Sequence, residues 1–347
     1  MAVFSHAEFD AHEAVHFVHD TDSGLRAIIA LHSTTLGPAA GGCRMWNYAD
    51  DDAALRDVLR LSRGMSYKNA MADIPLGGGK AVILGDAVSD KSEALFEAFG
   101  AAVDHLGGRY ITAEDVGISV ADMGIVARRT RHVSGLPSSQ GDAGGDPSPK
   151  TALGIYHGIR AAVAARLKRD DVRGLRVAVQ GLGSVGMNLC RLLNAAGARL
   201  VVADINSRSV QRAVAAFGAE PVAVESILFQ DVEVLSPCAL GGVLNAESIS
   251  RIQAPIVAGG ANNQLLSDAD GARLHERGIL YAPDYVINAG GIINVAAQYL
   301  NSMNDAEVDD KLAAIGPRLA EIFAIAQREG RPTNAVADEM ARSRIGR

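Results

Sequence analysis

Apolar positions recur along the chain with two spacings, and each spacing predicts one kind of element. Short apolar runs at 25–31 ("LRAIIAL") and 80–84 ("KAVIL") predict buried strands. Segment 51–70 instead places apolar residues three or four positions apart, as on one face of a helix, and "KSEALFEAFGAAVDHLG" repeats this helical spacing. The first part of the chain is therefore predicted to mix strands and helices.

The second half of the chain alternates strand and helix patterns, which is typical of a parallel sheet with helical crossovers. Between the halves, "SGLPSSQGDAGGDPSPK" is so rich in Gly, Pro, Ser and Asp that it favours a connection over any regular element. A chain of 347 residues also exceeds the usual size of a single core. We therefore predict an α/β protein of two domains, 1–135 and 151–330, joined by a linker at 136–150 and separated by a cleft.

The tail of the chain, 308–347, has a helical pattern that is interrupted near Gly330 and Pro332. This pattern predicts two helices. We expect the last of them, about 331–347, to pack back on the first domain.

Composition excludes several classes of function. The net charge is -7 and no basic cluster interrupts the sequence, so a nucleic-acid surface is not expected. The three cysteines, at 43, 190 and 238, are too few and too widely spaced for a disulfide framework or a metal site. Neither a secretory leader nor an apolar run of membrane-spanning length is visible. We therefore expect a cytoplasmic protein without a metal.

The clearest motif is a glycine-rich turn between two apolar strands, 177–179 and 200–203, with a helical pattern between them. Glycines in such a turn let backbone N–H groups approach a pyrophosphate at the helix N-terminus. An acid at the end of the second strand, here Asp204, can bind a ribose diol. The unit predicts a Rossmann-type, doubly wound dinucleotide-binding domain. The residues that we expect to contact the cofactor here are Gly181, Gly183, Ser184, Val185, Gly186, Asp204 and Ile205.

The acid also bears on the choice of cofactor. A carboxylate at Asp204 repels a 2′-phosphate and therefore favours NAD over NADP. Arg208 lies close enough in sequence to accommodate that phosphate, so the preference stays open.

Three later segments, "VEVLSPCALGG", "APIVAGGANNQ" and "GILYAPDYVINAGG", each join an apolar run to small and polar residues. In an open parallel sheet, ligands bind beyond the carboxyl ends of the strands, so these loops should line the cofactor crevice. Asparagines here are also common in turns, and Asn263 is expected to have only that structural role. The residues expected to contact cofactor are Cys238, Ala239, Ala261, Asn262 and Asn288.

In the first domain, "IPLGGGKAVILGD" brings three glycines next to Lys80. A nucleotide P-loop requires Ser or Thr after its lysine, and Ala81 stands there instead. The remaining alternatives are a glycine-rich turn before a strand and the surroundings of a reactive amine. Lys68 and Asp115 are the other groups of this domain that could handle charge or protons.

The chain resembles the Glu/Leu/Phe/Val amino-acid dehydrogenase family over nearly its whole length, most closely the leucine and valine types. The blocks that carry the resemblance stand in family order: "GPAAGGCRM", "MSYKNAMA", "LGGGKAVI", "GRYITAEDVG", "PCALGG", "GGANNQ" and "YAPDYVINAGGIINVA". The family implies reversible oxidative deamination of an L-amino acid by NAD⁺, which yields a 2-oxo acid and ammonium. It also implies a homo-oligomer.

The resemblance assigns roles to individual residues. Lys80 would be the general base and acid that activates water, and Asp115 would exchange protons with the amino group. Lys68, aided by Asn262, would pair with the substrate carboxylate, and Thr151 would contact the nicotinamide amide. A lysine can act as a base only where burial or a second cation keeps its amine partly neutral, and we expect Lys68 to supply that cation. The alternatives are structural roles without a part in the chemistry: two solvated lysines, an aspartate that caps a helix, and Thr151 as an N-cap.

The resemblance also maps a side-chain pocket that is apolar and has no cation for a distal carboxylate, which argues against glutamate. Ala40 departs from the leucine common in leucine-type enzymes and matches the phenylalanine type. An aliphatic substrate is therefore predicted, with phenylalanine as the alternative. Two other classes stay open, a silent NAD-binding sensor and a hydroxy-acid dehydrogenase. The residues predicted to contact the substrate, besides Lys68 and Asn262, are Ala40, Gly41, Gly42, Met65, Ala113, Ile292 and Val295.

Overall fold

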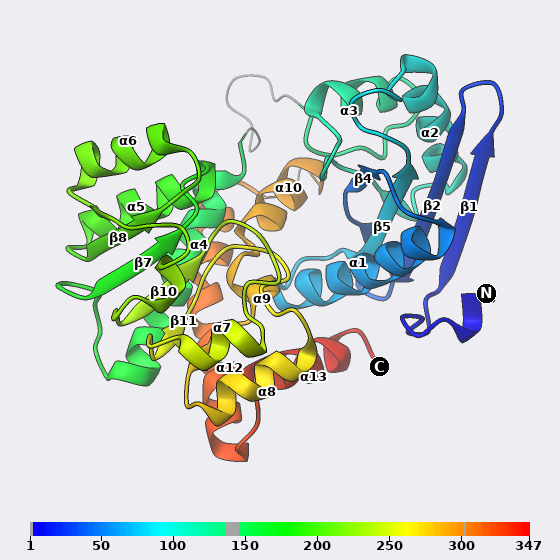
Figure 1. Ribbon diagram of the computed structural model, residues 1–347. Coiled ribbons are helices and arrows are strands. Elements are labelled where there is room, and N and C mark those ends of the chain that lie inside the picture. The colour runs from blue at the N-terminus through cyan, green and yellow to red at the C-terminus, as the bar shows by residue number, and fades with distance from the viewer. Residues whose placement is uncertain (1–2, 137–145, 301–302) are drawn as a thin grey trace. The chain divides into compact units, whose positions relative to one another are not determined.

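The computed structural model describes residues 3–136, 146–300 and 303–347, which form two compact units (Figure 1). Unit 1 comprises the described residues of Met1–Gly145, Asn294–Asp305 and Ala341–Arg347. Unit 2 comprises Asp146–Ile293 and Ala306–Met340.

This division differs in detail from the predicted one. Most of the linker predicted at 136–150 lies outside the described residues. Segment 294–305 belongs to unit 1, although the prediction placed it in the dinucleotide domain. Of the tail predicted to pack on the first domain, 331–347, only Ala341–Arg347 belongs to unit 1. The boundary between the units lies between Met340 and Ala341. No sequence pattern marks this boundary.

Unit 1 is built on a six-stranded sheet in the order β1-β2-β5-β3-β6, with β4 also paired to β5. β1 and β2 are antiparallel, as are β2 and β5, whereas β3 and β4 run parallel to β5. The predicted strands at 25–31 and 80–84 are confirmed as parts of β2 and β5. The strands are β1 (Ala14–Asp20), β2 (Leu25–Ser33), β3 (Ala39–Ala40), β4 (Cys43–Trp46), β5 (Gly77–Leu84) and β6 (Tyr110–Ile111).

Helices cover both faces of this sheet (Figure 1). Successive strand residues point to opposite faces, and β2 divides its side chains accordingly. Ile28 and Ala30 pack against α1, while Ile29 and Leu31 belong to the core that includes α2 and α3. The two helices predicted from apolar spacing are confirmed. The helices are α1 (Asp51–Met71), α2 (Glu93–His105) and α3 (Val120–Val126), and a short 3₁₀ turn, η1 (Val3–Ser5), precedes the sheet.

The three glycines before Lys80 lie inside β5, so the interpretation of this stretch as a turn is wrong. The glycines are needed because neighbouring groups approach the strand closely. A β-carbon on Gly78 would overlap the backbone and hydroxyl of Ser66 on α1, and one on Gly79 would lie 2.9 Å from the Tyr110 ring. The motif therefore lets α1 and β6 pack tightly against the strand that carries Lys80.

Gly78→Ala is expected to destabilise unit 1 by about 1–3 kcal/mol, because the new methyl group must displace α1 from the sheet. Urea unfolding followed by the fluorescence of Trp46, the single tryptophan of the chain, measures this loss within unit 1. Gly64→Ala on the same helix is the control. Nothing lies within 4 Å of its β-carbon, so this variant should be neutral or slightly more stable. Equal stability of the two variants would contradict the packing role of Gly78.

Unit 2 has a six-stranded parallel sheet in the order β12-β11-β10-β7-β8-β9. In chain order the strands lie as 6-5-4-1-2-3, which is the arrangement of a Rossmann domain. The predicted doubly wound α/β class is therefore confirmed. The strands are β7 (Arg176–Gln180), β8 (Arg199–Ala203), β9 (Glu220–Pro221), β10 (Val234–Pro237), β11 (Ile256–Val257) and β12 (Leu280–Tyr281).

Helices connect these strands and continue into the tail. Gly330, with φ of 63°, ends one tail helix, and Pro332 precedes the next, as predicted. A further break at Ala314 was missed because that residue keeps helical dihedral angles. The helices are α4 (Ser148–Leu167), α5 (Ser184–Ala195), α6 (Ser207–Phe217), η2 (Ile227–Phe229), α7 (Ala246–Arg251), α8 (Asp268–Glu276), α9 (Asp284–Ile287), α10 (Gly290–Leu300), α11 (Asp305–Ala313), α12 (Ile315–Glu329) and α13 (Thr333–Arg344).

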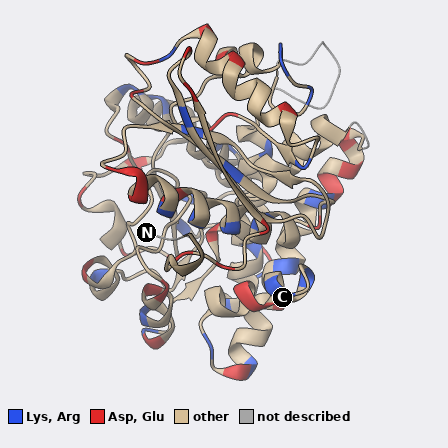
Figure 2. Cartoon of the chain, turned by 90° about the vertical axis from the view of Figure 1, so that its right-hand side faces the viewer, with Lys and Arg blue, Asp and Glu red and all other residues tan. Residues whose placement is uncertain are grey.

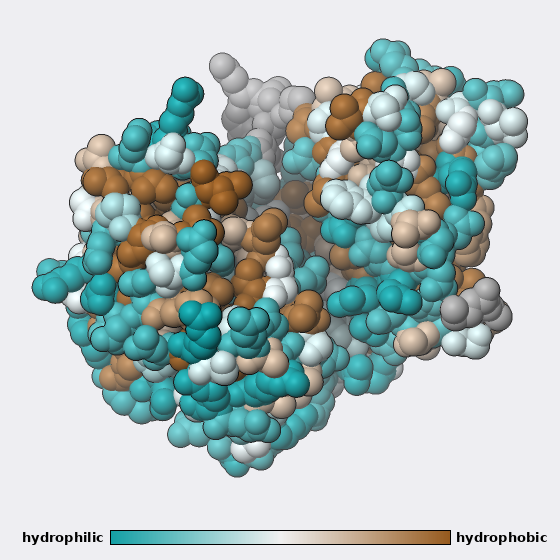
Figure 3. Space-filling model, viewed as in Figure 1, coloured by the Kyte–Doolittle hydropathy of each residue, from teal (hydrophilic) through white to brown (hydrophobic). Residues whose placement is uncertain are grey.

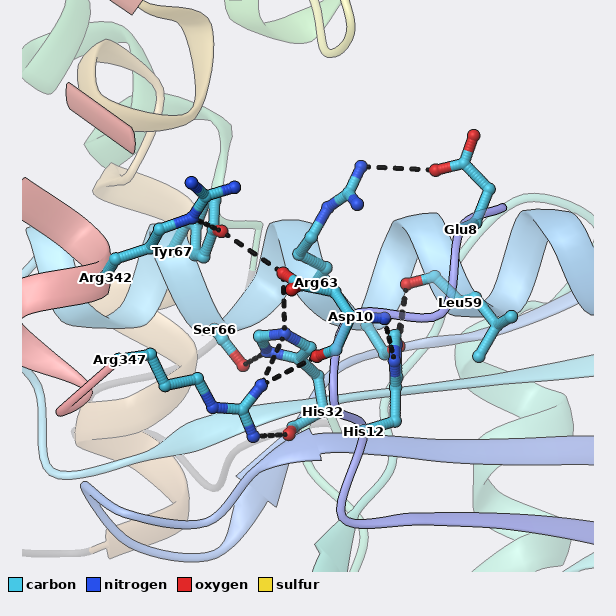
Figure 4. Close-up of polar contacts among 11 residues, drawn as sticks. Glu8, Asp10, His12, His32, Leu59, Arg63, Ser66, Tyr67, Arg342 and Arg347 are labelled. Atoms are coloured by element: carbon cyan, nitrogen blue, oxygen red, sulfur yellow. Dashed lines mark hydrogen bonds and ion pairs between the residues drawn. The ribbon is translucent and has the colours of Figure 1, made fainter. Parts of the chain in front are cut away.

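The end of the chain is anchored in unit 1 by arginines (Figure 4). Arg342 donates from Nε to the Tyr67 hydroxyl at 2.8 Å. Arg347 donates to the carbonyl oxygen of His32 at 2.7 Å and to that of Asp10 at 2.8 Å. The last residues therefore hold the N-terminal segment, β2 and α1 together.

Charges of both signs are interspersed along the elements rather than gathered by sign (Figure 2). In the part of the chain that the structure describes, no helix combines the length and the apolar composition that crossing a membrane requires.

Candidate functional site

The glycine turn of unit 2 has the geometry of a phosphate-binding turn. Gly181 has φ of 94°, a conformation that L side chains rarely adopt. Nothing lies within 4 Å of a β-carbon built on Gly183, which leaves room for a ligand. α5 begins at Ser184, and no side chain caps its first N–H groups. These donors and the positive end of the helix dipole suit a pyrophosphate.

Asp204 follows β8, directly beside this turn. Its carboxylate accepts hydrogen bonds from the backbone N–H of Leu182 at 2.5 Å and from that of Asn206 at 2.7 Å. These bonds fix the carboxylate at the edge of the turn, where a ribose diol of a bound dinucleotide would lie. Ile205, the next residue, is 92% exposed and offers an apolar surface at the same edge.

The loop after β10 lies against the glycine turn, and the loop after β11 bonds to the end of β10. A β-carbon on Gly181 would lie 2.8 Å from that of Ala239, and one on Gly186 would lie 3.7 Å from that of Cys238. Beyond β11, the Ala261 N–H donates to the Pro237 carbonyl at 2.9 Å. Cys238 and Ala239 are therefore neighbours of the glycine turn, and Ala261 lies at the end of β10.

The predicted asparagines differ in their surroundings. Asn288 is buried and donates from its side-chain amide to the Asn262 side-chain oxygen at 2.8 Å and to the Gly260 carbonyl at 3.2 Å. Asn263 has φ of 52°, a left-handed conformation in which asparagine is common. The structural role expected for Asn263 matches this turn geometry.

Exposed apolar side chains also lie on unit 2, where apolar residues are visible at the surface among polar ones (Figure 3). Besides Ile205, Leu240 after β10 is 78% exposed and Leu266 is 62% exposed. Leu240 was not among the predicted cofactor contacts, although it lies in the quoted block "PCALGG". Apolar side chains at strand ends can pack on the flat rings of a dinucleotide.

Thr151 lies in the first turn of α4 and does not cap it, so its interpretation as an N-cap is wrong. Pro147 occupies the N-cap position, and the Thr151 hydroxyl donates back to the Pro147 carbonyl at 2.9 Å. The same hydroxyl lies 3.0 Å from a β-carbon built on Gly291, near the start of α10. Within unit 2, Thr151 is therefore near Ile292.

In unit 1, the Lys80 ammonium and the Asp115 carboxylate form an ion pair, with 2.7 Å between Nζ and Oδ2. Lys80 lies in β5 and is 6% exposed, so it is not a solvated lysine. Asp115 follows β6 and caps no helix, because Ser119 is the N-cap of α3. The alternative roles of Lys80 as a solvated lysine and of Asp115 as a helix cap are therefore wrong. The contact of Lys80 that the structure shows is with a carboxylate, and the second cation expected from Lys68 stays a prediction.

Arg44 of β4 also binds this carboxylate, with 3.2 Å from its Nε to Asp115 Oδ2. Burial by itself raises the pKa of the Asp115 carboxyl, but the charges of Lys80 and then Arg44 outweigh it, and the pKa lies below its ordinary value. The aspartate is therefore ionised at neutral pH. Burial raises the pKa of the Cys43 thiol next to this pair, so the thiol is neutral.

The predicted substrate glycines lie beside these groups. A β-carbon on Gly42 would lie 2.9 Å from that of Asp115, and one on Gly41 would lie 3.0 Å from Met65 Cγ. Ala40 in β3 pairs with Gly78 of β5, and the Ala113 carbonyl accepts from the Cys43 N–H at 2.8 Å. A small-residue surface thus adjoins the ion pair and Met65.

The remaining predicted contacts are less closely defined. Lys68 lies in the last turn of α1 and is half-buried. Val295 lies in unit 1, where its carbonyl accepts from the Ser134 hydroxyl at 3.3 Å, whereas Ile292 belongs to unit 2. Their roles toward a substrate stay predictions.

Sequence patterns did not indicate Arg44, Asp57 and Tyr48. Arg44 binds Asp115, and Asp57 binds both Arg44 and Tyr48. Arg44 was visible as the cation in "GGCRM", two residues after the second substrate glycine. Asp57 and Tyr48 gave no comparable signal, because an acid on a helix and a tyrosine in a loop are usually surface residues.

Comparisons with known proteins address the same regions. The profile of the Glu/Leu/Phe/Val dehydrogenase dimerisation domain matches residues 12–132, and that of Glutamate/Leucine/Phenylalanine/Valine dehydrogenase matches 202–341. A leucine dehydrogenase from Bacillus subtilis is 49% identical over 100% of this chain and 95% of its own length. A phenylalanine dehydrogenase from Bacillus thermotolerans is 45% identical, over 96% of this chain and 88% of its own.

Among solved structures, an L-tryptophan dehydrogenase from Nostoc punctiforme superposes with a TM-score of 0.86 at 43% identity, and the match covers 96% of each chain. The Rossmann strand order and glycine turn of unit 2, the lysine–aspartate pair of unit 1 and these full-length similarities agree. The chain therefore belongs to the Glu/Leu/Phe/Val dehydrogenase family of NAD(P)-dependent amino-acid dehydrogenases.

Proposed function

We propose that this protein catalyses the NAD-dependent, reversible oxidative deamination of a branched-chain aliphatic L-amino acid. The observation that carries the proposal is the ion pair between the buried Lys80 and the partly buried Asp115, next to Gly42. A proton-handling pair in this form is what amine oxidation requires, because the amino group must lose protons and water must be activated. The 49% identical leucine dehydrogenase supports the substrate class.

The two groups of the pair have separate roles. Lys80 transfers protons to and from the water that attacks the imine formed from the substrate. Asp115 exchanges protons with the substrate amino group. Their contact at 2.7 Å allows a proton to pass between them once either partner changes its charge. Lys68 on α1 supplies a positive charge for the substrate carboxylate.

Unit 2 holds the cofactor. The N–H groups at the start of α5 bind the pyrophosphate, and Asp204 accepts hydrogen bonds from the ribose diol. When bound, the nicotinamide would supply the hydride acceptor for oxidation of the amino acid. A 2′-phosphate beside Asp204 would meet a carboxylate that already accepts two backbone hydrogen bonds, and this repulsion supports NAD over NADP.

The substrate pocket supports an aliphatic side chain over an acidic one. Ala40 is 4% exposed and Met65 is half-buried, and neither offers a cation to a distal carboxylate. The small side chain of Ala40 also favours phenylalanine as a second candidate, since it leaves space for a ring. Val295 of unit 1 is also apolar, and neither it nor Ile292 of unit 2 would offer a cation to a distal carboxylate.

The test compares kcat/KM for leucine, isoleucine, valine, phenylalanine and glutamate with NAD⁺ and with NADP⁺, followed by absorbance at 340 nm. We expect the highest value with a branched-chain substrate and NAD⁺. A higher value for phenylalanine would move the assignment to the aromatic class. NAD⁺ binding without turnover of any amino acid would instead indicate a sensor.

We also propose that the protein is a cytoplasmic homo-oligomer. The matched profile over 12–132 is described as a dimerisation domain, and β1 forms an edge of the unit 1 sheet. Sedimentation equilibrium tests this state, and a monomer at micromolar concentration would contradict it.

A further inference from the structure

Two cations share one oxygen of the Asp115 carboxylate. Lys80 Nζ lies 2.7 Å and Arg44 Nε 3.2 Å from Oδ2. Lys80 is held on β5 and Arg44 on the neighbouring strand β4, which runs parallel to it. The carboxylate is thus attached to two adjacent strands of the sheet, although its own residue lies in the loop after β6.

Arg44 is itself fixed from the other side. Its Nη1 donates to Asp57 Oδ2 on α1 at 2.9 Å. The Tyr48 hydroxyl donates to the same oxygen at 2.6 Å. A guanidinium holds several donors in one plane, so binding both acids at once fixes its orientation. Hydrogen bonds and ion pairs therefore form one continuous network, which runs from Tyr48 through Asp57, Arg44 and Asp115 to Lys80.

We propose that Arg44, held by Asp57, is a positioning residue that fixes the ionised Asp115 carboxylate beside Lys80. Arg44 acts through Asp115 and needs no contact with substrate. This role rests on the proposed function, because it assigns Asp115 to proton exchange. Without the arginine, the loop after β6 would hold its carboxylate through Lys80 and the Val116 N–H.

Three other titratable groups near Asp115 do not supply a positive charge in place of Arg44. Cys43 on β4 and Tyr110 on β6 are buried, and burial raises the pKa of each above its ordinary value, so both are neutral. Glu114 is exposed and carries the same sign as Asp115. Of the charges that lower the pKa of the carboxyl, those of Lys80 and then Arg44 are the largest.

A surface depression of about 490 Å³ gives access to the arginine. Arg44, Tyr48 and Asp57 line it together with Arg60. Arg60 is exposed and forms no ion pair with any residue in the described ranges, so it serves as a matched control from the same depression. The depression also admits a guanidinium ion to the space that a truncated Arg44 would vacate.

The first measurement does not depend on turnover. Carboxyl ¹³C NMR of aspartate-labelled protein follows the titration of Asp115, with the Asp115→Asn variant to identify its signal. In Arg44→Gln the pKa of Asp115 should rise by about 1 unit, because one of two nearby cations is lost. Arg60→Gln should leave it unchanged. An unchanged Asp115 titration in folded Arg44→Gln overturns the proposal, whether or not the wild type oxidises amino acids.

The second measurement is kinetic. Arg44→Gln should lower kcat about 10- to 100-fold, with little change in the KM for the amino acid, and shift the acidic limb of the pH profile upward. Asp57→Asn should also lower kcat and shift the acidic limb of the pH profile upward, but by smaller amounts. Millimolar guanidinium should restore part of kcat in Arg44→Ala and nothing in Lys80→Ala.

The control and the overturning result are equally specific. Arg60→Gln should keep wild-type kcat, and thermal melting should show that each variant is folded. Where Arg44→Gln does not fold, Arg44→Lys keeps the charge and tests the geometry alone. A loss of kcat in Arg60→Gln equal to that in Arg44→Gln would assign the effect to the depression as a whole and overturn the proposal. Absence of turnover in the wild type would overturn the proposed function, and the NMR titration would still decide the role of Arg44.

Discussion

Lys80→Ala is expected to lower kcat by about 10²–10⁴-fold while NAD⁺ binding stays close to that of the wild type. The reason is structural: Lys80 is 6% exposed in β5 of unit 1, and its ammonium contacts the Asp115 carboxylate at 2.7 Å. Removing it deletes the group that we assign to water activation. The dinucleotide crevice lies in unit 2 and keeps its residues. Steady-state kinetics with leucine, and titration of NAD⁺ by calorimetry, measure the two quantities.

A second lysine–aspartate pair in unit 1 provides the control. Lys91 binds Asp122 at 2.6 Å at the start of α3, without contact to the site. Lys91→Ala also removes one partner of an ion pair and should keep near-normal kcat. Turnover of Lys80→Ala within a few-fold of Lys91→Ala would remove Lys80 from the chemistry. Lys80→Gln, which keeps a polar side chain beside Asp115, guards against a loss that comes from unfolding.

Acidification is expected to destabilise unit 1 between about pH 6.5 and pH 4, because two neutral histidines are buried there. The rings of His12 and His32 lie 4.8 Å apart, edge to face (Figure 4). Burial lowers the pKa of His12 to about 4. Burial, the neighbouring His12 and Arg347 lower the pKa of His32 to about 3, although Asp10 opposes them.

The direction of the effect follows from proton binding. The unfolded chain protonates these histidines near pH 6.5, whereas the folded chain does so only near pH 4 and pH 3. Lowering the pH through this window therefore stabilises the unfolded state, and the stability of the folded state falls. The free energy of unfolding should fall by about 3 kcal/mol per histidine between pH 6.5 and pH 4.

Urea unfolding at a series of pH values measures this loss. Trp46 is the single tryptophan and lies in β4, so its fluorescence reports on unit 1. His12→Asn should show a smaller loss of stability between pH 6.5 and 4 than the wild type. His32→Asn should be less stable at pH 7, since it loses the bond to Ser66 at 2.8 Å, but should also respond less to acid. The exposed His19→Asn is the control, and a response in His12→Asn equal to that of His19→Asn would contradict the prediction.

Much of the fold and of the site could be predicted because the deciding patterns are local. The helix predicted at 51–70 is α1, Asp51–Met71, since its apolar spacing and its N-cap lie within a few residues of each other. The glycine turn, the helix after it and Asp204 also form one continuous segment. The blocks around Lys80 and Asp115 were each recognisable from a few neighbouring residues.

Contacts between residues far apart in the sequence could not be predicted without the tertiary structure. The glycines before Lys80 looked like a turn. Pairing with β2 and β3 makes this segment a strand, and the close approach of Ser66 and Tyr110 explains why glycine stands there. The ion pair between Lys80 and Asp115 joins residues 35 positions apart, and no local pattern indicated that contact.

The sequence by itself determined the α/β class, the dinucleotide motif and the family, because periodicity and short motifs depend on neighbours in the chain. The tertiary structure decided the partners of the charged groups. Arg44 meets Asp115 across 71 positions, and Arg347 meets His32 across 315. Ion pairs and hydrogen bonds act over a few ångströms in space, and a sequence does not record which distant residues the fold brings within that distance.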